Sequence, residues 1–199
     1  MKDTKKMVQL AVLVAIIAIM AFTPLGFLRV GVVEITLMMI PVAVAAIVVG
    51  PAGGAIAGGA FGITSFIQCF GISPFGTALM NINPFYTFIL TIVTRILAGW
   101  IPGLIYKALV KTGNKTVSVM AASIAAPVMN TVLFVGTLIL LFGQTEFIRG
   151  FGETAWQVVT FLVGLNALIE LGVGFVAGTA ISRSLVHFFP DRKSMTEKG

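Results

Sequence analysis

Long apolar stretches, separated by short polar or glycine-rich turns, run through almost the whole chain. Six of them are candidates for helices, at residues 7–27, 35–49, 51–70, 85–109, 117–142 and 158–186. A helix needs about 20 mainly apolar residues to cross a bilayer, and the shortest segment can still cross with little tilt. No segment shows the sustained alternation of apolar and polar residues that is typical of a strand in a membrane β-barrel. The pattern therefore predicts an all-α integral membrane protein, a six-transmembrane-helix bundle in a single domain, 1–199.

The composition agrees with this prediction. Of the 199 residues, 58% are hydrophobic and 10% are charged, and the mean hydropathy is +1.06. Soluble domains carry about a quarter charged residues. The N-terminal sequence MKDTKKMVQLAVLVAIIAIMAF is similar to a signal peptide, but no convincing cleavage site follows it. We therefore expect this segment to be retained as the first membrane helix.

Lysine and arginine are unevenly divided between the two sets of connecting segments. They precede the first predicted helix, flank the turn after the fourth, and follow or end the sixth: Lys2, Lys5, Lys6, Lys107, Lys111, Lys115, Arg183, Arg192, Lys193 and Lys198. The opposite segments contain Arg29 and Arg149, balanced by acidic residues. Cytoplasmic loops are enriched in these cations, so both termini are predicted to be cytoplasmic. The net charge of +6 then reflects topology and contact with anionic lipid, and gives no reason to expect a nucleic-acid partner.

Several kinds of chemistry find no support in the sequence. Cys69 is the single cysteine and His187 the single histidine, which excludes an internal disulfide, a cysteine-based metal cluster and a histidine-based catalytic site. No phosphate-binding loop of the Walker type is present, so the chain has no visible ATPase of its own. We expect no catalytic residues, no metal and no cofactor.

Polar residues inside the predicted helices are the first candidates for function, because charge in a membrane interior is costly and usually meets a partner or a cavity. Arg95 lies near the middle of the fourth predicted helix, Asn130 in the fifth, and Asn166 and Glu170 one turn apart in the sixth. Counted from the external helix ends, Arg95 and the two polar residues of the sixth helix have similar depths. Two interpretations stay open. Either Glu170 offsets the charge of Arg95 at a ligand site, with the amides orienting the ligand, or the two form a purely structural ion pair.

Further polar residues gather toward the expected external side. Thr64 and Gln68 are four residues apart in the third predicted helix and share a face. They are candidates for ligand contact, and satisfying backbone carbonyls is an equally good explanation. Asn83 and Tyr86 lie at the end of the uncharged stretch GISPFGTALMNINPFY. Amide and aromatic groups at the external opening of a site in a membrane protein suit a small polar organic ligand. Aromatic residues also anchor proteins at the membrane interface.

Small residues recur at helical spacing in two of the predicted helices. Ala11 and Ala15 are four residues apart in the first, and Gly54, Gly58 and Gly62 form two overlapping GxxxG steps in the third. Small side chains let a second helix approach closely. The glycines predict tight helix packing. The alanines predict either internal packing or the docking of a partner subunit.

Two stretches carry a resemblance to a known family: EITLMMIPVAVAAIVVGPAGGAIAGGAFGITSF and PFYTFILTIVTRILAG. With six predicted helices and the alanines of the first, the chain resembles the substrate-binding S components of energy-coupling factor (ECF) vitamin transporters. The resemblance covers nearly the whole length and is greatest to the branch that includes pantothenate-type components. Met39 stands just before the Ile-Pro pair, where members of that branch often have histidine.

The resemblance implies a role in transport across the cell membrane. An S component captures a vitamin outside, closes its external loops and topples in the membrane to release the vitamin inward. It works with a transmembrane coupling subunit and two ATPase subunits. Ala11 and Ala15 match the docking motif on the first helix of the family. The external loops after the first and third helices would be the gates, with the ligand between them and the last three helices.

Pantothenate is the expected substrate, because a guanidinium at Arg95 would bind its carboxylate and asparagines would bind its hydroxyl and amide groups. Pyridoxine, hydroxymethylpyrimidine, folate and riboflavin remain alternatives, and a neutral vitamin would be held by amides and aromatic rings. A stand-alone ion-coupled carrier is also open, although no inverted repeat of broken helices stands out. An intramembrane enzyme is disfavoured, because no histidine lies at depth and no carboxylates are adjacent.

Overall fold

The computed structural model describes residues 2–23, 26–30 and 33–150, together with positions 157, 175, 176, 179 and 180. Its elements, in chain order, are α1 (Lys2–Ala21), β1 (Phe27–Val30), β2 (Val33–Thr36), α2 (Met39–Val48), α3 (Pro51–Gln68), α4 (Pro74–Ile82), α5 (Pro84–Phe88), η1 (Ile89–Val93), α6 (Thr94–Leu109), η2 (Val110–Thr112), α7 (Lys115–Phe142) and α8 (Glu146–Arg149). The predicted sixth helix lies almost entirely outside the described residues.

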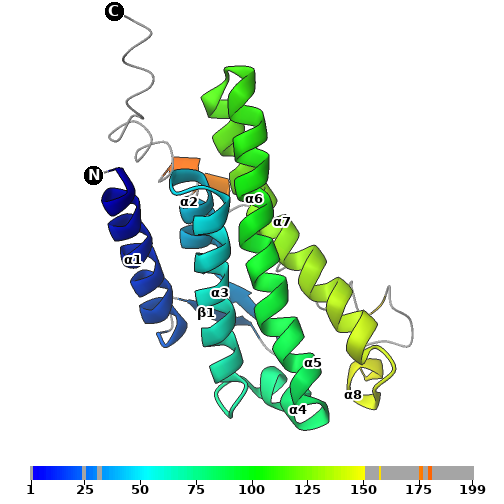
Figure 1. Cartoon of the computed structure of the whole chain (residues 1–199). Coiled ribbons are helices and arrows are strands. Elements are labelled where there is room, and N and C mark those ends of the chain that lie inside the picture. Colours follow the sequence, from blue (N-terminus) through cyan, green and yellow to red (C-terminus); the bar gives the residue numbers. More distant parts are fainter. Residues whose placement is uncertain are drawn as a thin grey trace, which may run out of the picture.

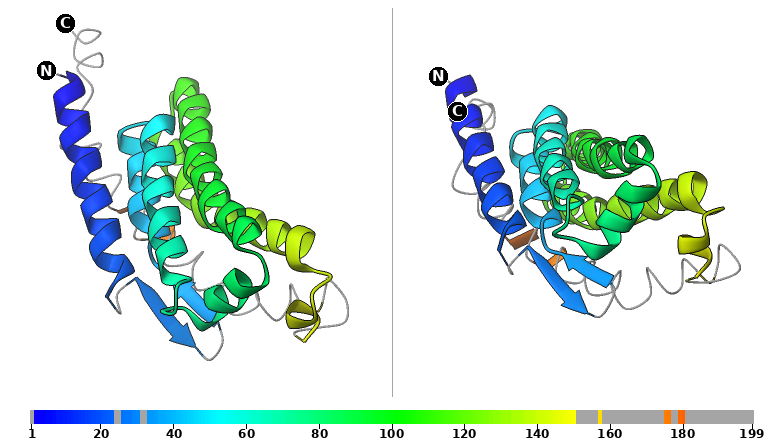
Figure 2. Two further views of the ribbon diagram at one scale, coloured as in Figure 1. Left: turned by 60° about the horizontal axis from the view of Figure 1, so that its bottom comes forward. Right: turned by 90° about the horizontal axis from the view of Figure 1, so that it is seen from below.

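The long helices run roughly along one direction (Figure 1). Helices α2 and α3 lie between α1 on one side and the pair α6 and α7 on the other, as both views in Figure 2 show. The N-terminus and the turn between α6 and α7 are at one end of the bundle, and α4, α5 and α8 are at the opposite end (Figure 1). Three described segments are long and apolar enough to cross a membrane: Thr4–Ala21, Pro84–Leu109 and Lys115–Phe142.

The connection between α1 and α2 differs from the prediction. Strands β1 and β2 form an antiparallel hairpin, in whose register Arg29 is opposite Glu34. The helix predicted from residue 35 therefore begins at Met39 instead, because valine, isoleucine and threonine favour the extended backbone of β2. The first helix, predicted to reach residue 27, ends at Ala21, since Pro24 disfavours helical backbone at the residue before it.

Glycine and proline lie at other helix boundaries, where their backbone preferences fit the local conformation. Gly50 has a φ of 107°, which only glycine adopts readily, and Pro51 follows in the first turn of α3. Gly113, with a φ of 90°, ends η2. The Asn114 side chain then caps α7 by accepting a hydrogen bond from the Val117 amide at 3.2 Å.

The fourth predicted helix is continuous but not uniform. It consists of α5, the π-helical turn η1, and α6. The hydroxyls of Thr87, Thr91 and Thr94 each donate to the carbonyl four residues earlier. π-helical turns are uncommon and occur frequently at functional sites, and η1 ends two residues before Arg95.

The glycines of α3 pack directly against the backbone of α6, which confirms the prediction of tight helix packing. A methyl group built on Gly58 would lie 2.1 Å from the carbonyl oxygen of Arg95, and one on Gly54 would lie 2.2 Å from that of Gly99. Both distances are well below van der Waals contact, so only glycine permits this approach. The backbone at Arg95 is therefore held at a fixed position against α3.

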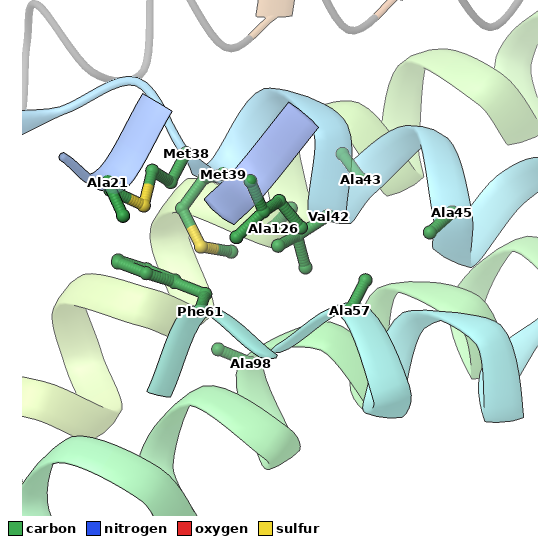
Figure 3. Packing of buried hydrophobic residues seen from close by; sticks show 11 residues of the cluster. Ala21, Met38, Met39, Val42, Ala43, Ala45, Ala57, Phe61, Ala98 and Ala126 are labelled. Atoms are coloured by element: carbon green, nitrogen blue, oxygen red, sulfur yellow. The ribbon is translucent and has the colours of Figure 1, made fainter. Parts of the chain in front are cut away.

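An apolar core joins α1, α2, α3, α6 and α7 (Figure 3). Small side chains such as Ala57, Ala98 and Ala126 are fully buried in it, together with the larger side chains of Phe61 and Met39. A second cluster, here called the end cluster, joins residues of α4, η1, α7 and α8. Its buried members are Leu79, Leu90, Leu138, Phe142 and Ile148, with partly buried Phe75, Phe134, Leu141 and Phe147 packed against them.

Candidate ligand site around Arg95

Arg95 is a buried cation on α6, with only 9% of its surface exposed. Its Nη1 donates a hydrogen bond to the carbonyl oxygen of Leu90 at 3.2 Å and another to the hydroxyl oxygen of Thr94 at 3.3 Å. The Leu90 carbonyl belongs to η1, so the irregular turn supplies an acceptor to the guanidinium. These bonds offset part of the cost of removing the charge from water.

Two phenyl rings from neighbouring helices also contact the Arg95 guanidinium. Its Cζ atom lies 5.0 Å from the ring centroid of Phe61 on α3 and 4.5 Å from that of Phe134 on α7. A cation within about 6 Å of a ring centroid is attracted by the ring quadrupole. This attraction stabilises the charge. A buried guanidinium with several N–H donors is suited to bind an anion.

Asn130 lies at the same level of the bundle as Arg95. It is 15 residues from Lys115 at the start of α7, and Arg95 is 14 residues from Leu109 at the end of α6. At about 1.5 Å per residue, both are roughly 21–23 Å from the turn that joins these two helices.

The Asn130 side chain is buried, with 6% of its surface exposed. Phe134, which contacts Arg95, follows Asn130 by one turn on the same face of α7. A buried amide can donate and accept, and buried polar groups are normally satisfied. Asn130 is therefore well placed to hydrogen-bond a ligand beside Arg95.

Thr64 and Gln68 are both engaged in backbone hydrogen bonds. Thr64 Oγ1 donates to the carbonyl of Phe61 at 2.8 Å, within α3. Gln68 Nε2 donates to the carbonyl of Ala21, which ties the end of α3 to the end of α1. The explanation that these side chains satisfy carbonyls is observed directly, and their contact with a ligand stays a prediction.

Asn83 and Tyr86 lie near the α4 end of the bundle. The Asn83 side chain caps α5 by accepting hydrogen bonds from the amides of Phe85 and Tyr86, both at 3.1 Å. The Tyr86 ring packs edge-to-face on Phe142, with centroids 6.0 Å apart. Asn83 precedes Arg95 by 12 residues, about 18 Å along a helix. Asn83 is therefore about three turns away from Arg95, and contact of Asn83 and Tyr86 with a ligand stays a prediction.

The remaining predicted positions divide into two groups. Asn166 and Glu170 lie outside the described residues, and their closeness to Arg95 stays a prediction. Ala11 and Ala15 are exposed on α1, on a helix whose outer surface also exposes Met7 (69%) and Val8 (58%). The described bundle does not bury these alanines, so they are available to lipid or to another protein.

Phe61 and Phe134 were not among the predicted site residues. Helical spacing places Phe61 three residues before Thr64 and Phe134 four residues after Asn130. The spacing alone could have placed both rings on the helix faces that carry the predicted polar residues Thr64 and Asn130. Which helices face each other, and hence that both rings meet Arg95, depends on the packing of the whole bundle.

Comparison with known proteins identifies the family. A profile of the family described as "ECF transporter, substrate-specific component" matches residues 5–181. The chain belongs to this family. It is thus a multi-pass membrane protein with a role in transport, not an enzyme, and the resemblance to S components seen in the sequence is confirmed.

Two relatives of this S component have names that specify a substrate. The pantothenate transporter PanT of Leuconostoc mesenteroides subsp. mesenteroides is 30% identical over 195 residues, which cover 92% of this chain and 93% of the relative. The pantothenic acid transporter PanT of Lactococcus lactis subsp. cremoris is 29% identical over 166 residues, which cover 77% of this chain and 78% of the relative.

Proposed function

We propose that this S component binds pantothenate and that Arg95 binds the carboxylate of the vitamin. The observation that carries the proposal is the buried Arg95 guanidinium, held by the Leu90 carbonyl, the Thr94 hydroxyl and two phenyl rings. A guanidinium binds a carboxylate through charged hydrogen bonds, which are stronger than neutral ones. The printed names of the two relatives support the same substrate.

Other residues would complete the site. The Asn130 amide, at the level of Arg95, is suited to the hydroxyl and amide groups of pantothenate. Asn166 and Glu170 are proposed to approach from the sixth helix, with Glu170 fixing the orientation of the guanidinium. Thr64, Gln68, Asn83 and Tyr86 are proposed to have mainly structural roles in the absence of ligand, because each already has a bond or ring contact.

The proposed topology places six helices across the membrane with both termini in the cytoplasm. The N-terminus and the basic turn with Lys107, Lys111 and Lys115 lie at the same end of the bundle (Figure 1), which supports it. Reporter fusions after Gly113 and at the C-terminus are expected to read cytoplasmic, and one near Gly150 external. A C-terminus that reads external would contradict the count of six helices.

The proposed partners are a transmembrane coupling subunit and two ATPase subunits, with pantothenate entering from the end of the bundle that carries α4 and α8. The family match supports dependence on an energizing module. Copurification with ATPases would separate this arrangement from a stand-alone ion-coupled carrier, which would transport pantothenate without them.

Calorimetry on the purified wild-type protein tests the proposed substrate. Pantothenate is expected to bind, and panthenol, in which a primary alcohol replaces the carboxylate, is expected to bind about ten- to a hundredfold more weakly. The difference follows from about 1.5–3 kcal/mol for a charged hydrogen bond. Pyridoxine, hydroxymethylpyrimidine, folate and riboflavin serve as competitors. Tight binding of one of these, without binding of pantothenate, would contradict the proposal.

A further inference from the structure

Phe134 belongs to two environments at once. Its ring lies 4.5 Å from Cζ of Arg95, and it also packs against the buried members of the end cluster. On α7 it stands between Asn130, one turn earlier, and Leu138, one turn later. The same face of the helix therefore runs from the candidate ligand site to the apolar end of the bundle.

Leu90 connects the same two regions from a different element. Its carbonyl oxygen accepts a hydrogen bond from Arg95 Nη1, and its side chain is fully buried in the end cluster. The Arg95 guanidinium thus meets the end cluster at two points, one from η1 and one from α7. Close packing leaves a partly buried ring few alternative rotamers, so the cluster holds the Phe134 ring in place against the cation.

We propose that Phe134 is a positioning residue: its ring, held by the end cluster, orients the Arg95 guanidinium so that it selects a carboxylate ligand. This inference rests on the proposed function of Arg95. The ring quadrupole attracts the cation, and an aliphatic side chain of similar size fills the same space without that attraction. Selectivity for charge should then depend on an aromatic residue at position 134, whereas stability should depend mainly on apolar volume.

The test compares two leucine substitutions in the same cluster. Phe134→Leu removes the ring that contacts Arg95. The matched control Phe142→Leu removes a fully buried ring two turns later on α7, whose described ring contact is with Tyr86. Both variants lose a phenyl group that packs in the end cluster, partly buried at Phe134 and fully buried at Phe142, so both should have a lower melting temperature. The diagnostic quantity is the ratio of the dissociation constant for panthenol to that for pantothenate, measured by calorimetry on folded, monodisperse protein.

Phe134→Leu is expected to lower this ratio by about three- to tenfold, within the range of a buried cation–π contact. Phe142→Leu should change it by less than about twofold, and Phe134→Tyr, which keeps the ring, should retain the wild-type ratio. If Phe134→Leu does not fold, Phe134→Met provides the same comparison with a more adaptable side chain.

The outcomes separate this inference from the proposed function. If Arg95→Gln brings the ratio toward one while the aliphatic variants at position 134 keep the wild-type ratio, Phe134 only fills space and the inference is wrong. An equal fall of the ratio in Phe134→Leu and Phe142→Leu would also overturn the inference, because a general loosening of the end cluster would then explain the lower ratio. If Arg95→Gln itself leaves the ratio unchanged, the proposed role of Arg95 fails, and the inference fails with it.

Discussion

Replacement of Arg95 with glutamine is expected to weaken pantothenate binding by about ten- to over a hundredfold. A hydrogen bond to a charged group contributes about 1.5–3 kcal/mol, and about 1.4 kcal/mol corresponds to tenfold in affinity. Arg95→Lys keeps the charge but loses the planar arrangement of donors, so it should restore only part of the affinity. Calorimetry gives the affinity, and a melting curve on the same sample shows whether each variant is folded.

Glu170→Gln is the control that separates ligand binding from a structural ion pair. If Arg95 only forms an ion pair with Glu170, loss of either partner should lower the melting temperature similarly. The affinity of the folded protein for pantothenate should then hardly change. If Arg95 binds the ligand, its loss should reduce affinity in protein that remains monodisperse. The glutamine variant at position 170 should then have the smaller effect, because Arg95 keeps its hydrogen bonds within the helix and its two ring contacts.

Double substitution of Ala11 and Ala15 with tryptophan is expected to abolish ATP-driven uptake and copurification with the energizing subunits. Both alanines are exposed on α1, and bulky side chains there would prevent a second helix from approaching. Pantothenate binding by the isolated chain should be preserved, because the two residues are exposed near the middle of α1, and the site lies on α6 and α7. Uptake into cells or proteoliposomes and a pull-down of the ATPases measure the two effects.

Val12 and Ile16 offer a matched control on the same helix. They are 54% and 40% exposed and lie about 100° around the helix from Ala11 and Ala15. Tryptophan at both of these positions adds similar bulk to a neighbouring stripe, and uptake should largely survive. Equal loss of uptake in the two double variants would mean that α1 tolerates no added bulk at all. Intact uptake in the alanine variant would show that docking does not use this face.

The long helices and the glycine packing could be predicted because both depend on local properties of the chain. Apolar length determines where α7 and the segment from α5 to α6 form. The four-residue spacing of Gly54 and Gly58 places both on one face wherever the helix packs. Contact with α6 rather than another helix depends on tertiary structure, and the spacing says nothing about it.

The β hairpin and the π-helical turn escaped prediction for different reasons. Residues 35 and 36 continue into the following apolar run, whereas β-branched side chains and pairing with 27–30 make residues 33–36 a strand. The π-helical turn requires a change of backbone hydrogen bonding within an apolar stretch whose composition is ordinary for a helix. Neither outcome can be read from hydropathy, because both replace one backbone hydrogen-bonding pattern with another.

The candidate site was predictable only in its polar members. Arg95 and Asn130 stand out because buried polar groups in a membrane need partners. Phe61 and Phe134 are ordinary residues for a membrane helix, and their role follows from the way α3 and α7 face α6. Asn83 was predicted for its polarity; its Oδ1 caps α5, and its contact with a ligand stays a prediction.

A pair of ligands that differ in charge tests most directly whether Arg95 binds the carboxylate of the vitamin. The dissociation constants of pantothenate and panthenol are measured by calorimetry, at one pH, for the wild type and for folded Arg95→Gln. The expected result is that the substitution weakens pantothenate by about ten- to a hundredfold and panthenol by much less, so that the two affinities converge. An unchanged affinity for pantothenate in the folded variant, or equal losses for both ligands, would contradict this role of Arg95.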